Sequence, residues 1–119
     1  MANPNLNSIS AVYGKTDVLD VTTTATAITS NAASSGKVMK VNMLVVSNIH
    51  GSAAVDINVD LFRGSTAYRL ASTINVPADS SLVVIGKENQ IYLMEGDSLR
   101  VTAGSASSAQ AVCSYEELS

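Results

Sequence analysis

One short segment has the residue types and the spacing of a cation site. Asp56, Asn58 and Asp60 occupy alternate positions, and carboxylate and amide oxygens in such a series can converge on a hard cation such as Ca²⁺. The rest of an EF-hand loop is missing, because Leu61 stands where the turn glycine is needed and Ala67 stands where the bidentate glutamate is needed. We therefore interpret the three residues as the polar face of a β-strand, and a weak surface cation site near Asp56 and Asp60 stays open as the alternative.

Two further segments match nucleotide-binding or catalytic chemistry only in part. Gly14, Lys15 and Thr16 resemble the end of a phosphate-binding loop, but Ile9 stands where the first glycine of that loop is required. His50 is the only histidine, so any acid-base mechanism would depend on it, and it lies in a short polar segment typical of a hairpin turn. A nucleophile beside it would also need an orienting carboxylate and an oxyanion donor in a pocket, which nothing in the sequence indicates. We expect no catalytic residues, no cofactor and no enzymatic activity.

The chain has a single cysteine, Cys113. An internal disulfide is therefore excluded, and so is a structural zinc site, because no two Cys or His ligands stand at metal-binding spacing. Cys113 alternates with Ala111 and Tyr115 on one face of an expected strand, which favours a small core residue over a reactive thiol. A lone cysteine suits the reducing cytoplasm in which we expect the chain to be made.

These residues belong to a succession of short strands. Apolar and polar residues alternate, and turn residues interrupt the alternation at intervals of about eight to twelve positions. The pattern predicts an all-β fold: an antiparallel β-sandwich of jelly-roll or immunoglobulin-like type with eight or nine strands. The predicted strands cover residues 9–13, 16–28, 37–48, 53–61, 66–76, 82–85, 90–94, 98–103 and 110–116.

Three of these strands have informative faces. In 53–61 the apolar residues all point one way and the polar residues the other, so one face belongs to the core and one to solvent. This strand is expected to form a hairpin with 66–76. The strand 37–48 is apolar on both sides, which predicts a central or interface strand. We expect Tyr68, Leu70, Ile74 and Val76 to share one face of 66–76, and Met39, Val41, Met43 and Val45 to share one face of 37–48, opposite Leu44 and Val46.

Charge is sparse. Charged residues make up 14% of the chain, against about 25% in ordinary soluble domains, and the net charge is −3. The seven basic residues are scattered, so there is no cluster of cations for a nucleic-acid backbone. No segment has the length of a membrane-spanning helix or the organisation of a signal peptide. We expect neither nucleic-acid binding nor membrane insertion, and a weakly charged surface that repels neighbouring copies little.

The length of 119 residues predicts one folded domain, residues 9–119, preceded by an arm over residues 1–8. The arm lacks an apolar period and is expected to order only when docked. Tyr92 beside Met94 is the best anchor for a contact with a partner. The candidate interaction residues are therefore Tyr92, Met94, Asn3, Pro4 and Asn5.

Several segments together resemble small virion structural proteins of tailed phages, particularly phages of marine cyanobacteria. They are residues 38–48 (VMKVNMLVVSN), 56–59 (DINV), 76–84 (VPADSSLVV) and 91–101 (IYLMEGDSLRV), and the resemblance covers most of the chain. It implies a non-enzymatic component of a virion, without implying in which part of the particle. It transfers no catalytic residues.

The resemblance and the weakly charged surface lead to one expectation and two alternatives. We expect a capsid decoration or cement subunit that stabilises the shell of the virion, made in the host cytoplasm. The expected partners are other virion proteins, the major capsid protein or neck and tail proteins, and other copies of the chain. The first alternative is a neck, tail or fibre component, including one that contacts the host surface. The second is a small carbohydrate-binding β-domain, against which the scarcity of aromatic residues counts.

Overall fold

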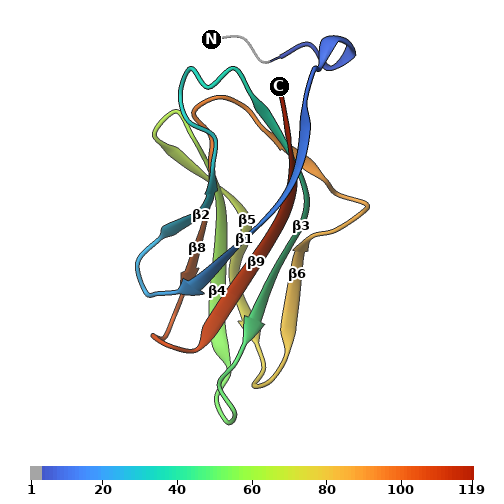
Figure 1. Cartoon of the computed structure of the whole chain (residues 1–119). Coiled ribbons are helices and arrows are strands. Elements are labelled where there is room, and N and C mark those ends of the chain that lie inside the picture. The colour runs from blue at the N-terminus through green and yellow to red at the C-terminus, as the bar shows by residue number, and fades with distance from the viewer. Residues whose placement is uncertain (1–3) are drawn as a thin grey trace.

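The computed structural model describes residues 4–119 and confirms the predicted all-β sandwich, with two antiparallel sheets packed face to face (Figure 1). The helical segment of this part of the chain is a single 3₁₀ turn, Leu6–Ser8, and no helix there has the length and apolarity needed to cross a membrane. The described residues form nine strands: β1 (Val12–Val21), β2 (Thr26–Ser30), β3 (Val38–Asn48), β4 (Val55–Arg63), β5 (Thr66–Val76), β6 (Ser81–Ile85), β7 (Ile91–Leu93), β8 (Ser98–Ala103) and β9 (Ala109–Leu118).

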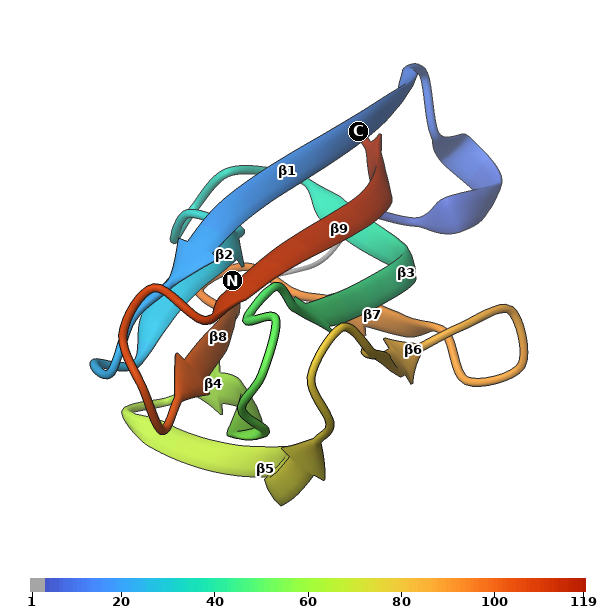
Figure 2. The ribbon, with the colours of Figure 1, turned by 90° about the horizontal axis from the view of Figure 1, so that it is seen from below.

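The strand order is that of a jelly roll. Sheet A has the order β1-β9-β3-β6, with β7 also paired to β3, and sheet B has the order β2-β8-β4-β5. Each strand of the first half of the chain pairs with a strand of the second half, as when one long hairpin is rolled up, and β1 and β2 lie in different sheets. In an immunoglobulin domain the first two strands are neighbours in one sheet, so the topology decides between the two expected types. Figure 2 shows the two layers, with β1 and β5 at opposite corners of the sandwich.

The core lies between the sheets and follows the alternation of the strands. Inward side chains from both layers are fully or almost fully removed from solvent, because each strand directs every second residue toward the facing sheet. The best-buried large residues include Leu44, Ile57, Ile85, Leu93 and Leu99.

A β-bulge changes the faces of β3. Its register with β9 shifts between Val41 and Met43, so that Asn42 is an extra residue in β3. The inward set is therefore Met39, Val41, Leu44 and Val46, whereas Met43 and Val45 point outward. The expected single alternation was wrong in the second half of this strand, because the inserted residue reverses the side to which the following side chains point. The prediction of a central strand is confirmed, since β3 lies between β9 and the pair β6 and β7.

The predicted hairpin forms, but the apolar face of β5 is only partly covered. Gly64 and Ser65 both have positive φ values, +58° and +64°, as a two-residue type I′ turn requires. In β5 only Val76 of the expected apolar face is buried, and the other three members are exposed. The strand is the outermost in sheet B, its register with β4 shifts twice, and the short β6 covers little of its inner side. Exposed members of the face are Tyr68, Leu70 and Ile74.

The N-terminal strand boundaries also differ from the prediction. The long run 16–28 is interrupted at residues 22–25, where the chain turns from β1 in sheet A to β2 in sheet B. Thr22 and Thr26 both donate their hydroxyl hydrogen bonds to the carbonyl of Thr24, at 3.0 and 2.9 Å. Threonine hydroxyls that bind nearby backbone groups compete with strand pairing, which explains the break.

Candidate interaction surfaces

His50 acts as a support for the loop between β3 and β4. Its Nδ1 accepts hydrogen bonds from the backbone N–H groups of Ser52 (3.1 Å) and Ala53 (3.0 Å). The backbone N–H of His50 donates to Oδ1 of Asn48 (2.8 Å). The ring therefore holds the turn predicted for this segment. The lone pair of Nδ1 is therefore engaged by the backbone of the loop.

The alternating polar residues of β4 bind neighbouring side chains and backbone. Asp60, expected on the solvent face, is buried instead, because Arg69 of the adjacent β5 lies over it. In residues 4–119 no three Asp, Glu, His or Cys side chains are placed to share a metal ion. The contacts are Asn75 Nδ2 to Asp56 Oδ1 (3.0 Å), Thr73 N–H to Asn58 Oδ1 (2.7 Å) and Arg69 Nη1 beside Asp60 Oδ1 (3.1 Å).

Cys113 is a core residue, as its alternation predicts. It is fully buried between the sheets with Ala111 and Tyr115. Burial raises the pKa of its thiol to about 11, so the nucleophilic thiolate is scarce at neutral pH.

Charged groups cluster at the C-terminal end of β9. Glu117 is almost fully buried and forms ion pairs with Lys15 of β1 (3.1 Å) and Lys37, just before β3 (3.0 Å). The hydrogen bond from Lys37 is the main reason why the pKa of Glu117 is lower than usual. This cluster ties the three strands together and leaves both lysines half exposed.

The outer face of sheet A carries a row of four valines, here called the valine row: Val18, Val112, Val45 and Val83. The residues are direct partners across β1, β9, β3 and β6, so they stand side by side on one surface. Val18 is 74% exposed and Val83 is 62% exposed, and the two between them are half buried. A continuous apolar row on the solvent side of a sheet is typical of a contact surface.

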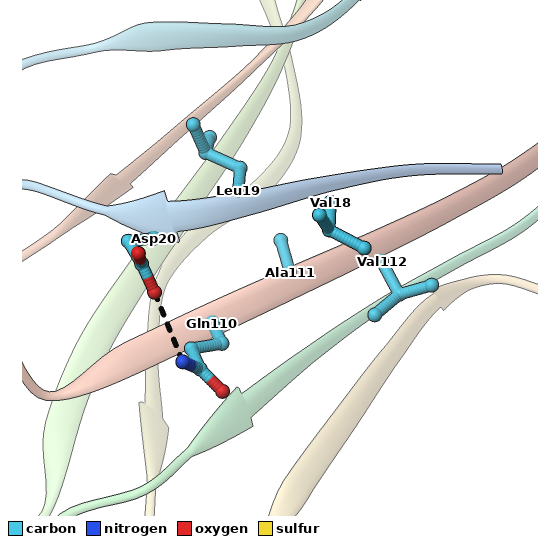
Figure 3. A pocket seen from close by; sticks show the side chains of 6 residues that line it. All are labelled: Val18, Leu19, Asp20, Gln110, Ala111 and Val112. Carbon is cyan, nitrogen blue, oxygen red and sulfur yellow. Dashed lines mark hydrogen bonds between the residues drawn. The ribbon is translucent and has the colours of Figure 1, made fainter.

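The surroundings of the valine row carry little charge. On one side lies the uncharged row of Thr16, Ser114 and Met43. On the other side lies a row in which Gln110 Nε2 donates to Asp20 Oδ1 (2.9 Å). Figure 3 shows this edge of the surface, with Val18 of β1 next to Val112 of β9, and with Asp20 bonded to Gln110 along a shallow hollow. The middle of the face can therefore lose water without burying an unpaired charge.

The outer face of sheet B differs in kind. Arg100 of β8 stacks over the ring of Phe62 at 3.5 Å from the ring centre, beside the ion pair of Arg69 and Asp60. Both arginines have partners within the chain, and arginines over this face keep it hydrated. Of the two outer faces, sheet A offers the surface suited to burial against a partner.

The structure brings three of the five predicted interaction residues together. Pro4, Tyr92 and Met94 line an apolar hollow of about 280 Å³ with Leu6 and Val38. The hollow lies where the N-terminal arm passes over the end of sheet A, and Tyr92 remains 45% exposed beside it. Its size and apolar lining leave few polar groups for orienting a sugar or cofactor.

The other two predicted residues are not part of this hollow. The side chain of Asn5 accepts a hydrogen bond from the N–H of Asn7 (2.9 Å) and so begins the 3₁₀ turn. Asn3 lies outside the described residues.

Sequence reasoning missed the polar side chains that fasten the ends of the sandwich. Asn31 donates to the carbonyls of Lys37 (2.9 Å) and Leu93 (3.0 Å). Asn48 donates to the carbonyls of Ala53 and Val76, each at 2.9 Å. Both asparagines are buried, and each joins segments that lie far apart in the sequence. Their position directly after or at the end of an apolar strand was the available signal, but their partners were not predictable from it.

The valine row was also missed. Val45 and Val83 were recognised as strand residues, but only the strand order reveals that four valines from four strands meet.

Comparison with known proteins identifies a shared fold. No protein-family model matches the chain, and no curated protein matches it. A solved structure described as "Bacillus endospore appendages form a novel family of disulfide-linked pili" aligns over 100% of this chain and 96% of that chain. The TM-score is 0.54 and the sequence identity is 14%. At this identity the likeness concerns the arrangement of the strands.

Proposed function

We propose that this chain is a non-enzymatic virion structural protein of a tailed phage, a decoration or cement subunit that binds the capsid exterior and stabilises the shell. The observation that carries the proposal is the valine row on a weakly charged part of sheet A. The segments that resemble phage virion proteins support it, as does the low charged fraction of 14%.

The stabilising effect would come from burial of apolar surface. Transferring an exposed valine side chain into an interface contributes roughly 1 to 2 kcal/mol. Val18 and Val83 have the most surface to lose. A subunit that binds only the assembled shell stabilises that shell by mass action, and many copies act together. The partners under this proposal are the major capsid protein and other copies of the chain, in a virion assembled in the host cytoplasm.

A second candidate is a structural subunit of the neck, tail or fibre. The similarity in fold to a solved structure described as belonging to disulfide-linked pili favours it, because pili are polymers. That polymer is described as disulfide-linked, whereas the single cysteine of this chain is buried in the core. A polymer of this chain would therefore depend on non-covalent contacts. The carbohydrate-binding alternative has less support, since the apolar hollow near Tyr92 offers a sugar few polar partners.

The copy number of the protein in purified particles tests this proposal. Quantitative mass spectrometry should find hundreds of copies per particle if the protein covers the shell, and at most some dozens if it belongs to the neck, tail or fibre. Absence from purified particles would exclude both candidates.

Variants of the valine row test the surface itself. Val18→Asp and Val83→Asp should fold normally, since both side chains are exposed, but should prevent incorporation because a charge would be buried against the partner. Ile49→Asp is the matched control, an equally charged change at an exposed apolar residue in the loop after β3. Normal incorporation of both valine variants would contradict the assignment of this surface.

A further inference from the structure

β1 has a free edge that is long and regular. It pairs with β9 on one side through ten consecutive partners without a register shift, from Val12–Leu118 to Val21–Ala109. Within the described chain no strand pairs with its other side. The first half of β1 is exposed, with Tyr13 57% exposed on the inward side, so sheet B does not cover it there. Unpaired backbone groups along such an edge are ready to accept another strand.

The remaining edges of the described sheets are protected. β5 has two register shifts along its pairing with β4, and β2 has one in five residues. β6 also has five residues and a shifted register, and β7 has only three residues. Bulges and short length are the usual means of preventing pairing at a sheet edge. An added strand therefore has one suitable edge to join.

We propose that the occupant of this edge is β1 of a second copy, paired antiparallel around a two-fold axis at Thr16. Because β1 is the suitable edge on each copy, the pairing is of the strand with itself and the interface is symmetric. Antiparallel strands related in this way keep their faces, so inward residues meet inward residues. The resulting partners are Val12 with Asp20, Tyr13 with Leu19, Gly14 with Val18, Lys15 with Asp17, and Thr16 with Thr16.

The charges of β1 select this register. With the axis at Thr16, Lys15 lies opposite Asp17 of the other copy, twice by symmetry, and the large apolar side chains of Tyr13 and Leu19 are opposed. Moving the axis by one residue toward the N-terminus opposes Lys15 with itself, and moving it the other way opposes Asp17 with itself. Opposite charges across a strand pair are favourable, and like charges directly opposite are unfavourable.

The dimer would enlarge the surface described above. Sheet A of one copy continues into sheet A of the other, and both valine rows lie on the same side of the joined sheet. The inference does not depend on the proposed place in a virion, since it can be measured on the isolated protein.

Cross-linking tests the register. In a pair centred on Thr16 the two Cα atoms of this residue lie about 5 Å apart, within the range of a disulfide. Thr16→Cys should therefore give a covalent dimer under mild oxidation, visible on a non-reducing gel. Val18→Cys is the control: position 18 is exposed, as position 16 is, but its two copies would be about 14 Å apart. The native Cys113 is buried and should not contribute.

Sedimentation tests the association itself. The paired segment is small, so we expect a dimer in the micromolar range over concentrations from roughly 1 to 300 µM. Thr16→Lys should raise the dissociation constant about fivefold or more, because like charges meet at the axis. Ser114→Lys, one strand away on the same face, is the matched control and should leave it unchanged. A native chain that stays monomeric throughout, a dimer unaffected by Thr16→Lys, or equal cross-linking of Val18→Cys would overturn the proposal.

Discussion

At the scale of single residues, the side chains of reactive types, such as His50 and Cys113, stabilise the fold. His50 supports a loop through Nδ1, and Asp97 accepts hydrogen bonds from Arg63 Nε and from the N–H of Met94, each at 2.8 Å. Cys113 is kept neutral in the core. Buried polar groups need partners, and His50 and Asp97 find theirs in backbone groups and side chains of the same chain. His50 and Asp97 therefore connect segments of the fold.

The ion pairs of Glu117 predict a specific acid sensitivity. The pKa of Glu117 in the folded chain is lower than the ordinary 4.5, chiefly because of the hydrogen bond from Lys37. The ionised carboxylate therefore stabilises the fold fully above pH 4.5, and this stabilisation is lost as the pH falls through the folded-state pKa. Glu117→Gln should lower the free energy of unfolding at pH 7 by about 1 kcal/mol, since both lysines are half exposed. It should also reduce the loss of stability that occurs as the pH falls below about 4.5.

Urea unfolding at a series of pH values measures both effects. Glu88→Gln, at an exposed position in the loop after β6, is the control and should leave the pH profile unchanged. If Glu117→Gln loses stability at low pH as steeply as the native chain, the ion pairs do not contribute to the acid sensitivity.

At the scale of elements, the position of a strand decides how much a residue contributes. Ile57 of β4 and Ile74 of β5 are direct partners on the same side of sheet B. Ile57 is fully buried, whereas Ile74 is 39% exposed because β5 is the edge strand. Two isoleucines that look alike in the sequence are therefore unequal in packing.

This pair gives a direct prediction. Ile57→Ala should lower the free energy of unfolding by about 3 kcal/mol, because it leaves a cavity in the core, and Ile74→Ala by less than about 1 kcal/mol. Thermal or chemical denaturation of both variants provides the comparison. Equal losses would mean that the inner side of β5 is covered, contrary to the geometry of the edge.

At the scale of the whole molecule, the two outer faces differ in chemical character. Sheet B presents charged side chains that are paired within the chain, and sheet A presents apolar side chains without cover. The N-terminal arm lies at one end of sheet A, where Pro4 and Leu6 contribute to the apolar hollow. The arm therefore lies against sheet A, the sheet whose valine row is proposed to contact the capsid.

Deleting residues 1–7 tests the role of the arm. The 3₁₀ turn buries none of its side chains, and Ser10 and Ala11 would keep their hydrogen bonds to the carbonyl of Ser119. We therefore expect the melting temperature to change by no more than about 3 °C, while incorporation into particles weakens. Calorimetry and particle purification measure the two effects. Unchanged incorporation would remove the arm from the interface, and a large loss of stability would make it part of the core.

The sequence by itself was sufficient for the fold class, for most strands and for the inward position of Cys113. These features follow from alternation of apolar and polar residues with a period of two, which is a local property. For example, the predicted strands 66–76 and 98–103 have the same bounds as β5 and β8. Bulges at Asn42 and in β5 were not predictable, since an inserted residue has no distinct composition.

Only the tertiary structure decided which strands are neighbours, and the candidate surfaces depend on that. The jelly-roll order aligns Val18, Val112, Val45 and Val83, and it leaves β1 with a regular free edge. It also gives Asn31, Asn48 and Glu117 their distant partners. Pairing between strands is a long-range property set by the packing of the whole core, so neither a row across four strands nor an unpaired edge is visible in any one segment of the sequence.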